Sequence, residues 1–193
     1  MLNTKRSRVR AAAGVGMAAV VATVGAVTYN ASAAEQAAVV APAAVGPEAR
    51  AVSIPGIPAA IKPPKGAKPI GAYVVATGTQ TYTCTGGVFT GASVPEAQLI
   101  GTGGRIHHFG GPSWQSTRDK SLVKAKKVGE SARTGTIPEL LLEVTEKSGS
   151  GVIGTSTHIS RLLTSGGTAP AGACTDGATK AVKYGAVYVF WKV

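Results

Sequence analysis

From about residue 70 onward, apolar and polar residues alternate in short runs that glycine, threonine, serine and proline interrupt. Side chains of a β-strand point alternately to two faces, so runs of this kind predict strands joined by turns. Eight segments fit this pattern: 72–76, 80–84, 98–101, 105–109, 121–128, 140–147, 152–163 and 183–192. They predict an all-β fold, a single antiparallel β-sandwich or small barrel.

Two of these segments also predict their place in the sheet. In 183–192, the even positions from Tyr184 and the odd positions from Val187 are both apolar, which indicates a central strand buried on both faces. In 121–128, Lys124 and Lys126 alternate with apolar residues. That pattern favours a half-exposed or edge strand whose lysines oppose edge-to-edge pairing.

The segment 140–147 fits two structures. Its apolar residues alternate as in a strand, whereas Pro138 and charged residues at four-residue spacing also fit a helix. We favour the strand, because Ser-Gly-Ser-Gly at 148–151 is a turn sequence that would join it to the next strand as a hairpin.

The first 33 residues have the order of a secretory signal peptide. An uncharged run from 11 to 27 and the small residues Ala31-Ser32-Ala33 follow four cations: Lys5, Arg6, Arg8 and Arg10. The apolar run is short and weakly hydrophobic for a membrane span. We predict cleavage after residue 33, secretion to an extracellular location and no membrane attachment afterwards.

Residues 34–69 differ from the segments on either side. They hold seven of the eleven prolines and no aromatic residue. A segment that buries so little apolar surface does not offset the entropy of ordering. We predict an Ala/Pro-rich disordered linker over 34–69 and a single β-rich domain over 70–193.

The chain holds two cysteines, Cys84 and Cys174. Thiols outside the cell tend to be oxidised, and two is the smallest number that can pair. We predict a disulfide between them, with free thiols or a metal site as the alternatives.

The net charge of the chain narrows the possible partners only in part. The chain carries a net charge of +11, and without the four cations of the signal peptide its 16 basic and 9 acidic side chains leave +7. The cations are spread out, so a solvated basic surface is the simplest interpretation, and attraction to anionic cell-wall polymers is the functional one. No nucleic-acid module is present, so we expect no nucleic-acid partner.

The pattern G-x-G-x-x-G at 149–154 matches a dinucleotide-binding fingerprint in spacing only. That site needs a buried strand before it and a long helix after it, whereas the residues after Gly154 are β-branched and polar. We interpret the pattern as a glycine-rich hairpin and predict no cofactor.

Three histidines are candidate metal ligands. His107 and His108 point to opposite faces of a strand, so one of them at most could join His158. A carboxylate such as Glu96 or Asp119 would be a further ligand. Nothing in the spacing selects such a site, so we favour structural roles for the histidines and predict no metal.

An enzyme is a competing hypothesis. A secreted hydrolase or metal-dependent enzyme would pair His108 with one of the carboxylates Glu96, Asp119 or Asp176. The sequence has no G-x-S-x-G nucleophile motif. We therefore assign no catalytic residue.

The run from His108 to Trp114 is the densest cluster of unusual residues. Two glycines let its backbone turn sharply and Pro112 stiffens it, so His108 and Trp114 could form an aromatic, hydrogen-bonding platform. Trp114 could stack on a sugar ring, or it could pack under a loop as a core residue.

Several stretches across residues 71–193 occur together, in the same order, in a known family. They are Gly78 to Cys84, Pro95 to Leu99, His108 to Trp114, Ile137-Pro138 with Leu140 to Leu142, Ile159 to Pro170 leading to Cys174, and Tyr184 to Phe190. In these stretches the chain resembles domain-of-unknown-function family 3455, a family of secreted bacterial and fungal proteins. The resemblance implies export, pairing of Cys84 with Cys174, and an unknown activity.

The chain departs from that family at two places. Glu139 stands where the family usually has tryptophan, and Asp119-Lys120-Ser121 stands where an Asp-Gly-Ser turn is usual. Some fungal members carry a malate dehydrogenase label, which the interpretation of 149–154 does not support.

Our leading hypothesis is an extracellular, non-enzymatic β-domain that binds or associates with anionic or polysaccharide cell-wall material. The candidate ligand contacts are His108, Trp114 and Arg161, together with exposed lysines. A purely structural secreted protein, in which these residues serve folding alone, is a further alternative.

Overall fold

A computed structural model describes residues 56–193. The predicted signal peptide, 1–33, and residues 34–55 of the predicted linker lie outside the described residues. Between residues 56 and 193, no helix has the length and apolar character needed to cross a membrane.

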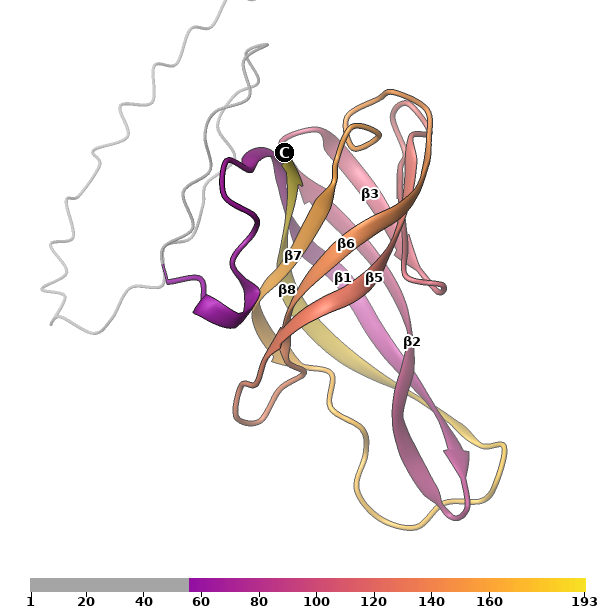
Figure 1. Cartoon of the computed structure of the whole chain (residues 1–193). Coiled ribbons are helices and arrows are strands. Elements are labelled where there is room, and N and C mark those ends of the chain that lie inside the picture. The colour runs from indigo at the N-terminus through magenta and orange to yellow at the C-terminus, as the bar shows by residue number, and fades with distance from the viewer. Residues whose placement is uncertain (1–55) are drawn as a thin grey trace, which may run out of the picture. The chain divides into compact units, whose positions relative to one another are not determined.

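Eight antiparallel strands form a closed barrel (Figure 1), in which each strand pairs with the next along the chain and the last pairs back with the first. A short 3-10 helix, η1 (Ala59–Ile61), precedes them. The strands are β1 (Lys68–Thr85), β2 (Val88–Gly101), β3 (Gly104–Phe109), β4 (Ser113–Ser116), β5 (Leu122–Ser131), β6 (Glu139–Ser148), β7 (His158–Gly166) and β8 (Thr179–Lys192). The all-β prediction is confirmed, in its barrel form.

β8 is buried on both faces, as its sequence predicts. Tyr184, Tyr188 and Phe190 belong to the main apolar core, which fills the barrel. Val189 and Trp191, at the intervening positions, belong to a second apolar cluster on the outside. The inner face borders the core, and the outer face is covered because residues that precede β1, among them Ile61, pack against it.

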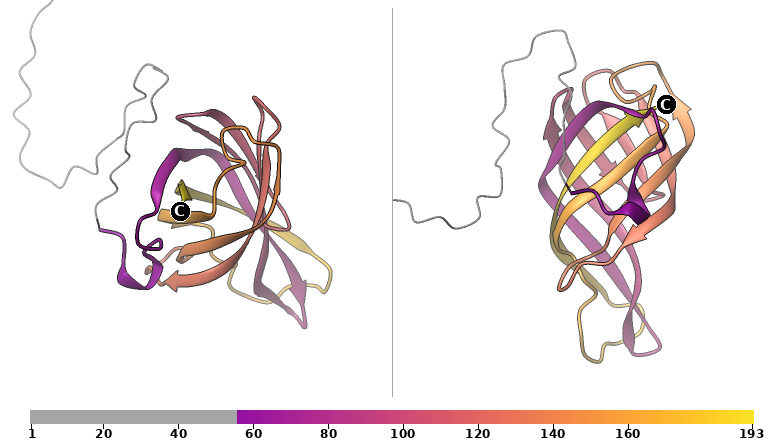
Figure 2. Two further views of the ribbon diagram at one scale, coloured as in Figure 1. Left: turned by 45° about the horizontal axis from the view of Figure 1, so that its top comes forward. Right: turned by 60° about the vertical axis from the view of Figure 1, so that its left-hand side comes forward.

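The segment before β1 is part of the folded domain. Ile61 of η1 is fully buried and packs with Leu141 of β6, Leu162 of β7 and Trp191 of β8. Figure 2 shows this segment on the outer surface of the barrel. The structure therefore differs from the expected boundary at residue 69, because an isoleucine within the proline-rich stretch anchors it to the strands.

β5 is the half-exposed strand that its sequence allowed, with Val123 and Ala125 buried and the lysines more exposed, and it does not lie at an edge. It pairs with both β4 and β6, since a closed barrel has no free edge. Its lysines do face outward, where Lys124 Nζ lies 2.8 Å from Glu146 Oε2 and Lys126 Nζ lies 3.1 Å from Glu143 Oε2. The lysines thus form cross-strand ion pairs with β6.

Other segments differ mainly in their bounds. The ambiguous segment 140–147 belongs to a strand, β6, as we favoured, whereas 72–76 and 80–84 are parts of the single strand β1. Strand β4 was not predicted, and residues 152–157 form a loop instead of the start of a strand. The glycine-rich pattern lies in this loop, between the antiparallel strands β6 and β7.

Cys84 and Cys174 form the predicted disulfide, with their Cα atoms 6.0 Å apart. Cys84 lies beside the turn of the β1–β2 hairpin, and Cys174 lies in the loop between β7 and β8. Figure 1 shows this hairpin and this loop extending together beyond the other strands. Backbone hydrogen bonds flank the disulfide, from Cys174 N to Gly87 O at 3.0 Å and from Gly177 N to Cys84 O at 3.0 Å.

Replacement of Ile61 tests whether the segment before β1 stabilises the barrel. We expect Ile61→Ala to lower the free energy of unfolding by about 2–5 kcal/mol, because it leaves a cavity in the second cluster. Urea unfolding of the purified protein measures this change. Val74→Ala is the control, since Val74 is 51% exposed and its loss should matter by no more than about 0.5 kcal/mol. Equal effects of the two substitutions would contradict the packing described here.

Candidate functional site

A cavity of about 120 Å³ lies within the barrel. His108, Trp114 and Arg161, the three predicted ligand contacts, line it together with Gln80 and Tyr188. Prolines, leucines and a serine complete its walls. A larger hollow of about 490 Å³ lies beside the segment before β1, but a single lysine is the only charged residue of its lining.

His108 and Trp114 form one wall of the cavity. They are directly opposite each other on β3 and β4, and their rings stack with centroids 4.3 Å apart and planes 3° from parallel. His108 is 3% exposed and Trp114 is 1% exposed. Trp114 is therefore not a surface platform on which a sugar ring of a polymer could stack, and any ligand it contacts lies inside the barrel.

His108 is neutral at pH 7. Its Nδ1 lies 2.8 Å from the carbonyl oxygen of Ser113, and because a carbonyl only accepts, Nδ1 carries the proton. Burial lowers the pKa of His108 to about 4, and the positive charge of Arg161 acts in the same direction, against the opposing effect of the Ser113 hydrogen bond. Nε2 of the ring is then an unprotonated acceptor.

Two buried donors on the cavity wall have no partner. The indole Nε1 of Trp114 and the amide Nε2 of Gln80 form no hydrogen bond within the described chain. The Ser93 hydroxyl donates to Gln80 Oε1 at 2.6 Å, which orients the amide and leaves its NH₂ group unpaired. An unpaired buried donor lowers the free energy of unfolding by about 1–3 kcal/mol. Each of these two groups therefore reduces the stability of the fold.

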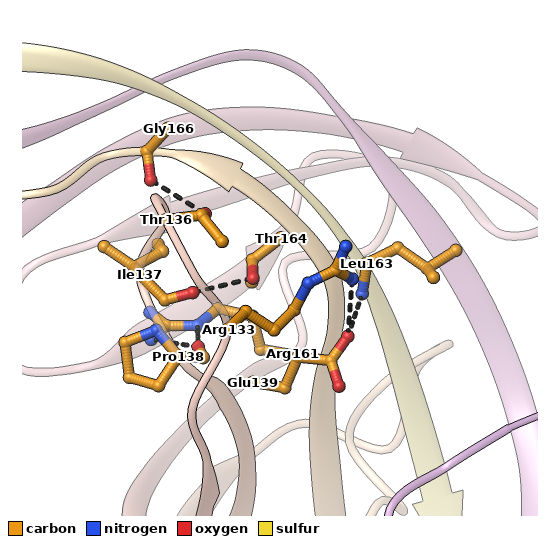
Figure 3. A network of polar contacts seen from close by, with 9 residues as sticks. All are labelled: Arg133, Thr136, Ile137, Pro138, Glu139, Arg161, Leu163, Thr164 and Gly166. Atoms are coloured by element: carbon orange, nitrogen blue, oxygen red, sulfur yellow. Dashed lines mark hydrogen bonds and ion pairs between the residues drawn. The ribbon is translucent and has the colours of Figure 1, made fainter.

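Arg161 brings a positive charge to the cavity. Its Nε and Nη2 donate to the carbonyl oxygen of Pro138 at 3.2 and 2.9 Å (Figure 3). Burial raises the pKa of Tyr188, and the positive charge of Arg161 opposes that rise. No carboxylate of residues 56–193 forms an ion pair with Arg161.

The nearby carboxylate of Glu139 has other partners. Its Oε1 accepts from Arg133 Nη1 at 3.0 Å and from the amide of Leu163 at 2.7 Å. The register of β7 shifts after Leu162, and Leu163 adopts a left-handed conformation with φ of 49°. A bulky residue rarely adopts such a conformation. At this irregularity in β7, the backbone amide of Leu163 lies where it donates to Glu139.

The carboxylates considered for catalysis do not join His108. Glu96 Oε1 lies 2.6 Å from Nε2 of His107, which faces away from the barrel interior. Asp119 lies in the β4–β5 turn, where hydrogen bonds from Ser121 and from the amide of Val152 lower its pKa to about 2.

The remaining candidates are equally dispersed. Asp176 accepts from the amide of Gly87 at 2.9 Å, close to the disulfide. His158 contacts the hydroxyl of its neighbour Thr157 at 3.1 Å. Over residues 56–193, no three His, Cys, Asp or Glu side chains are grouped so that they could hold a metal ion.

Three polar residues of the cavity were not predicted from the sequence: Gln80, Ser93 and Tyr188. The available signal for Gln80 was its position, since it alternates with Tyr82 and Cys84 on the inward face of β1. An amide at an inward position of a strand is a candidate for a polar site, because buried polar groups need a partner.

The fold and the cavity define a class of protein: a disulfide-bonded, closed antiparallel β-barrel with a small, polar-lined interior site. The chain belongs to the family described as protein of unknown function (DUF3455), whose family model matches residues 64–192. The resemblance noted in the sequence is thereby confirmed. No curated protein and no solved structure matches the chain significantly.

The buried histidine makes stability depend on pH. The ordinary pKa of histidine is near 6.5 and that of folded His108 is about 4, so the unfolded chain takes up the proton first as the pH falls. The contribution is complete above pH 6.5 and is lost between pH 6.5 and 4. From pH 7 to pH 5 we expect a loss of about 2 kcal/mol in the free energy of unfolding.

Urea unfolding at pH 7 and pH 5 measures this loss. His108→Phe keeps a ring against Trp114 but does not titrate, so its stability should change less than the wild type between the two pH values. His107→Gln is the matched control and should keep the full dependence. The same pH dependence in all three proteins would refute the assignment to His108.

Proposed function

We propose that this chain is an exported, non-enzymatic binding domain whose barrel cavity takes up a small molecule. One observation carries the proposal: Gln80 and Trp114, each with a buried donor that has no partner within the described chain, line one cavity together with Arg161. Concave sites that combine apolar walls with a few convergent polar groups are the usual form of small-molecule sites.

The fold suits this role. Closed antiparallel barrels of eight strands have interiors that hold side chains or one small ligand. The disulfide and the N-terminal sequence pattern both fit an extracellular location.

The cavity chemistry favours binding over hydrolysis. His108 is neutral, its Nδ1 proton is engaged by a backbone carbonyl, and the cavity lining contains no carboxylate that could act with it. The hydroxyl of Ser93 donates to Gln80 instead of being activated by a base. General acid–base or nucleophilic catalysis needs such paired groups.

A purely structural role is the alternative to binding, and Gln80→Leu separates the two. We expect this substitution to abolish binding of small acceptors and to raise the free energy of unfolding by about 1 kcal/mol, since it removes an unpaired buried donor. Calorimetric titration with propionamide and propionate measures binding, and urea unfolding measures stability.

The control is Gln98→Leu, because Gln98 lies between the inward residues Ala97 and Leu99 and so faces away from the cavity. It should leave binding unchanged. A destabilised Gln80→Leu protein, together with a wild type that binds neither compound, would support the structural alternative.

A second candidate function, association with anionic cell-wall material, has its own supporting observation. Six exposed cations lie at the barrel end where β1 and β3 start and β6 and β8 finish, and none forms an ion pair within the described chain. They are Lys68, Arg105, Arg118, Lys120, Lys147 and Lys192. Lys68 and Lys192 are direct cross-strand neighbours. Clustered cations attract polyanions in a salt-dependent manner.

Sedimentation with insoluble wall material that carries phosphodiester polymers tests this association. We expect binding at low salt that weakens as salt rises, and weaker binding of a Lys68→Glu, Lys192→Glu variant. A Lys180→Glu, Lys183→Glu variant has the same charge change at the opposite end of β8 and should bind like the wild type. Equal loss in both variants would show that net charge alone, and not this end of the barrel, determines binding.

A further inference from the structure

We infer that the cavity binds a small aliphatic carboxylate, whose charged group lies between Arg161 and the donors of Gln80 and Trp114 and whose short carbon chain faces the leucines and prolines. The inference rests on the proposed function, because it assigns a ligand class to the same cavity. It follows from the charge, the hydrogen-bonding groups, the walls and the size of that cavity.

The charge of the cavity is positive. Arg161 is the only ionised group in its lining, since His108 is neutral and burial keeps Tyr188 protonated. Glu139, the acidic residue drawn beside Arg161 in Figure 3, is already bonded to Arg133 and to the amide of Leu163. A partly buried cation without a counter-ion favours an anion from outside.

The hydrogen-bonding groups are mainly donors. Trp114 offers one N–H and Gln80 an NH₂ group, and both side chains are more than nine-tenths buried without a partner for these atoms. A carboxylate has two oxygens that accept several hydrogen bonds and has no donor. A cationic amine would meet the like charge of Arg161, so it does not fit.

The walls and the size limit the rest of the ligand. Leu140, Leu142, Pro95 and Pro112 supply an apolar surface beside the polar groups. A cavity of about 120 Å³ is smaller than the ~150 Å³ cavity that holds benzene in an engineered protein. A carboxylate with a chain of a few carbons therefore fits this volume.

The chain contains an internal control for detecting such a ligand. Its two tryptophans differ in one respect: Nε1 of Trp114 has no partner, whereas Nε1 of Trp191 donates to Ser160 Oγ at 2.9 Å. A carboxylate in the cavity would bond to the first indole and leave the second unchanged. The two indole N–H signals of an NMR spectrum report the two sites separately.

The experiment compares propionate with propionamide, which has the same shape and no charge. We expect propionate to shift the Trp114 indole signal of the exported protein saturably, to leave the Trp191 signal in place, and to bind at least about tenfold more tightly than propionamide, because charge-assisted hydrogen bonds are the stronger ones. Trp114→Phe assigns the two signals.

Arg161→Gln tests the source of the preference. It should bring the affinities for propionate and propionamide to within about twofold of each other, and this ratio is read within one protein, so a lower stability of the variant does not affect it. Arg133→Gln is the matched control, since Arg133 belongs to the same network but does not line the cavity, and it should keep the tenfold preference.

The outcomes distinguish the inference from the proposed function. If propionamide binds as well as or better than propionate, the carboxylate assignment is overturned and the cavity remains a binding site. If neither compound moves the Trp114 signal, the cavity holds only water and both proposals fail. If Arg161→Gln keeps the wild-type preference, the positive charge of Arg161 is not what recognises the ligand, and the inference fails.

Discussion

The antiparallel pairing of β1 with β8 closes the barrel, and the size of its interior follows from that closure. The pairing runs from Lys68 opposite Lys192 to Thr83 opposite Thr179, with an irregularity between Val74 and Thr79. Because the circumference is fixed at eight strands, inward side chains fill most of the space and leave only a small cavity. Polar groups that point inward have only this limited volume in which to find partners, and two of them, Gln80 Nε2 and Trp114 Nε1, have none within the described chain.

Arg161 is the interior group that this constraint affects most. It projects from the inward face of β7, and its hydrogen bonds go to the Pro138 carbonyl instead of to a carboxylate. Glu139 is held by Arg133 and by a backbone amide that the irregularity in β7 provides. The same network that stabilises this end of the sheet therefore leaves the cavity positive.

The sequence predicted the individual strands better than it predicted their closure into a barrel. Alternation located β6 and the doubly buried β8, because both signals depend on neighbouring residues within one segment. Strand β4 has four residues and follows a glycine-proline turn, so its alternation is too short to detect. Whether β5 lies at an edge depends on the pairing of β1 with β8, which no local pattern reports.

The sequence predicted three residues of the candidate site, but it did not determine whether they lie at the surface or in the interior of the barrel. His108 and Trp114 were singled out as neighbours across a turn, and the structure pairs them directly. The sequence left two roles open for Trp114, stacking on a sugar ring or packing as a core residue, and the alternation of β3 and β4 turns both rings inward. The sequence did not indicate Gln80 as a site residue, because an amide side chain in a strand commonly lies at the surface. Only the closed barrel shows that it faces the interior.

The Cys84–Cys174 bond makes the 91 residues from one cysteine to the other a covalent ring. This ring contains all of β2 to β7, whereas most of β1 and all of β8 lie on the two tails that leave it. A protease that cuts any single loop within the ring converts it to an open chain without releasing a fragment, and the paired tails still hold the cut ends near their native places. The domain can thus lose one peptide bond in most of its loops and remain one molecule.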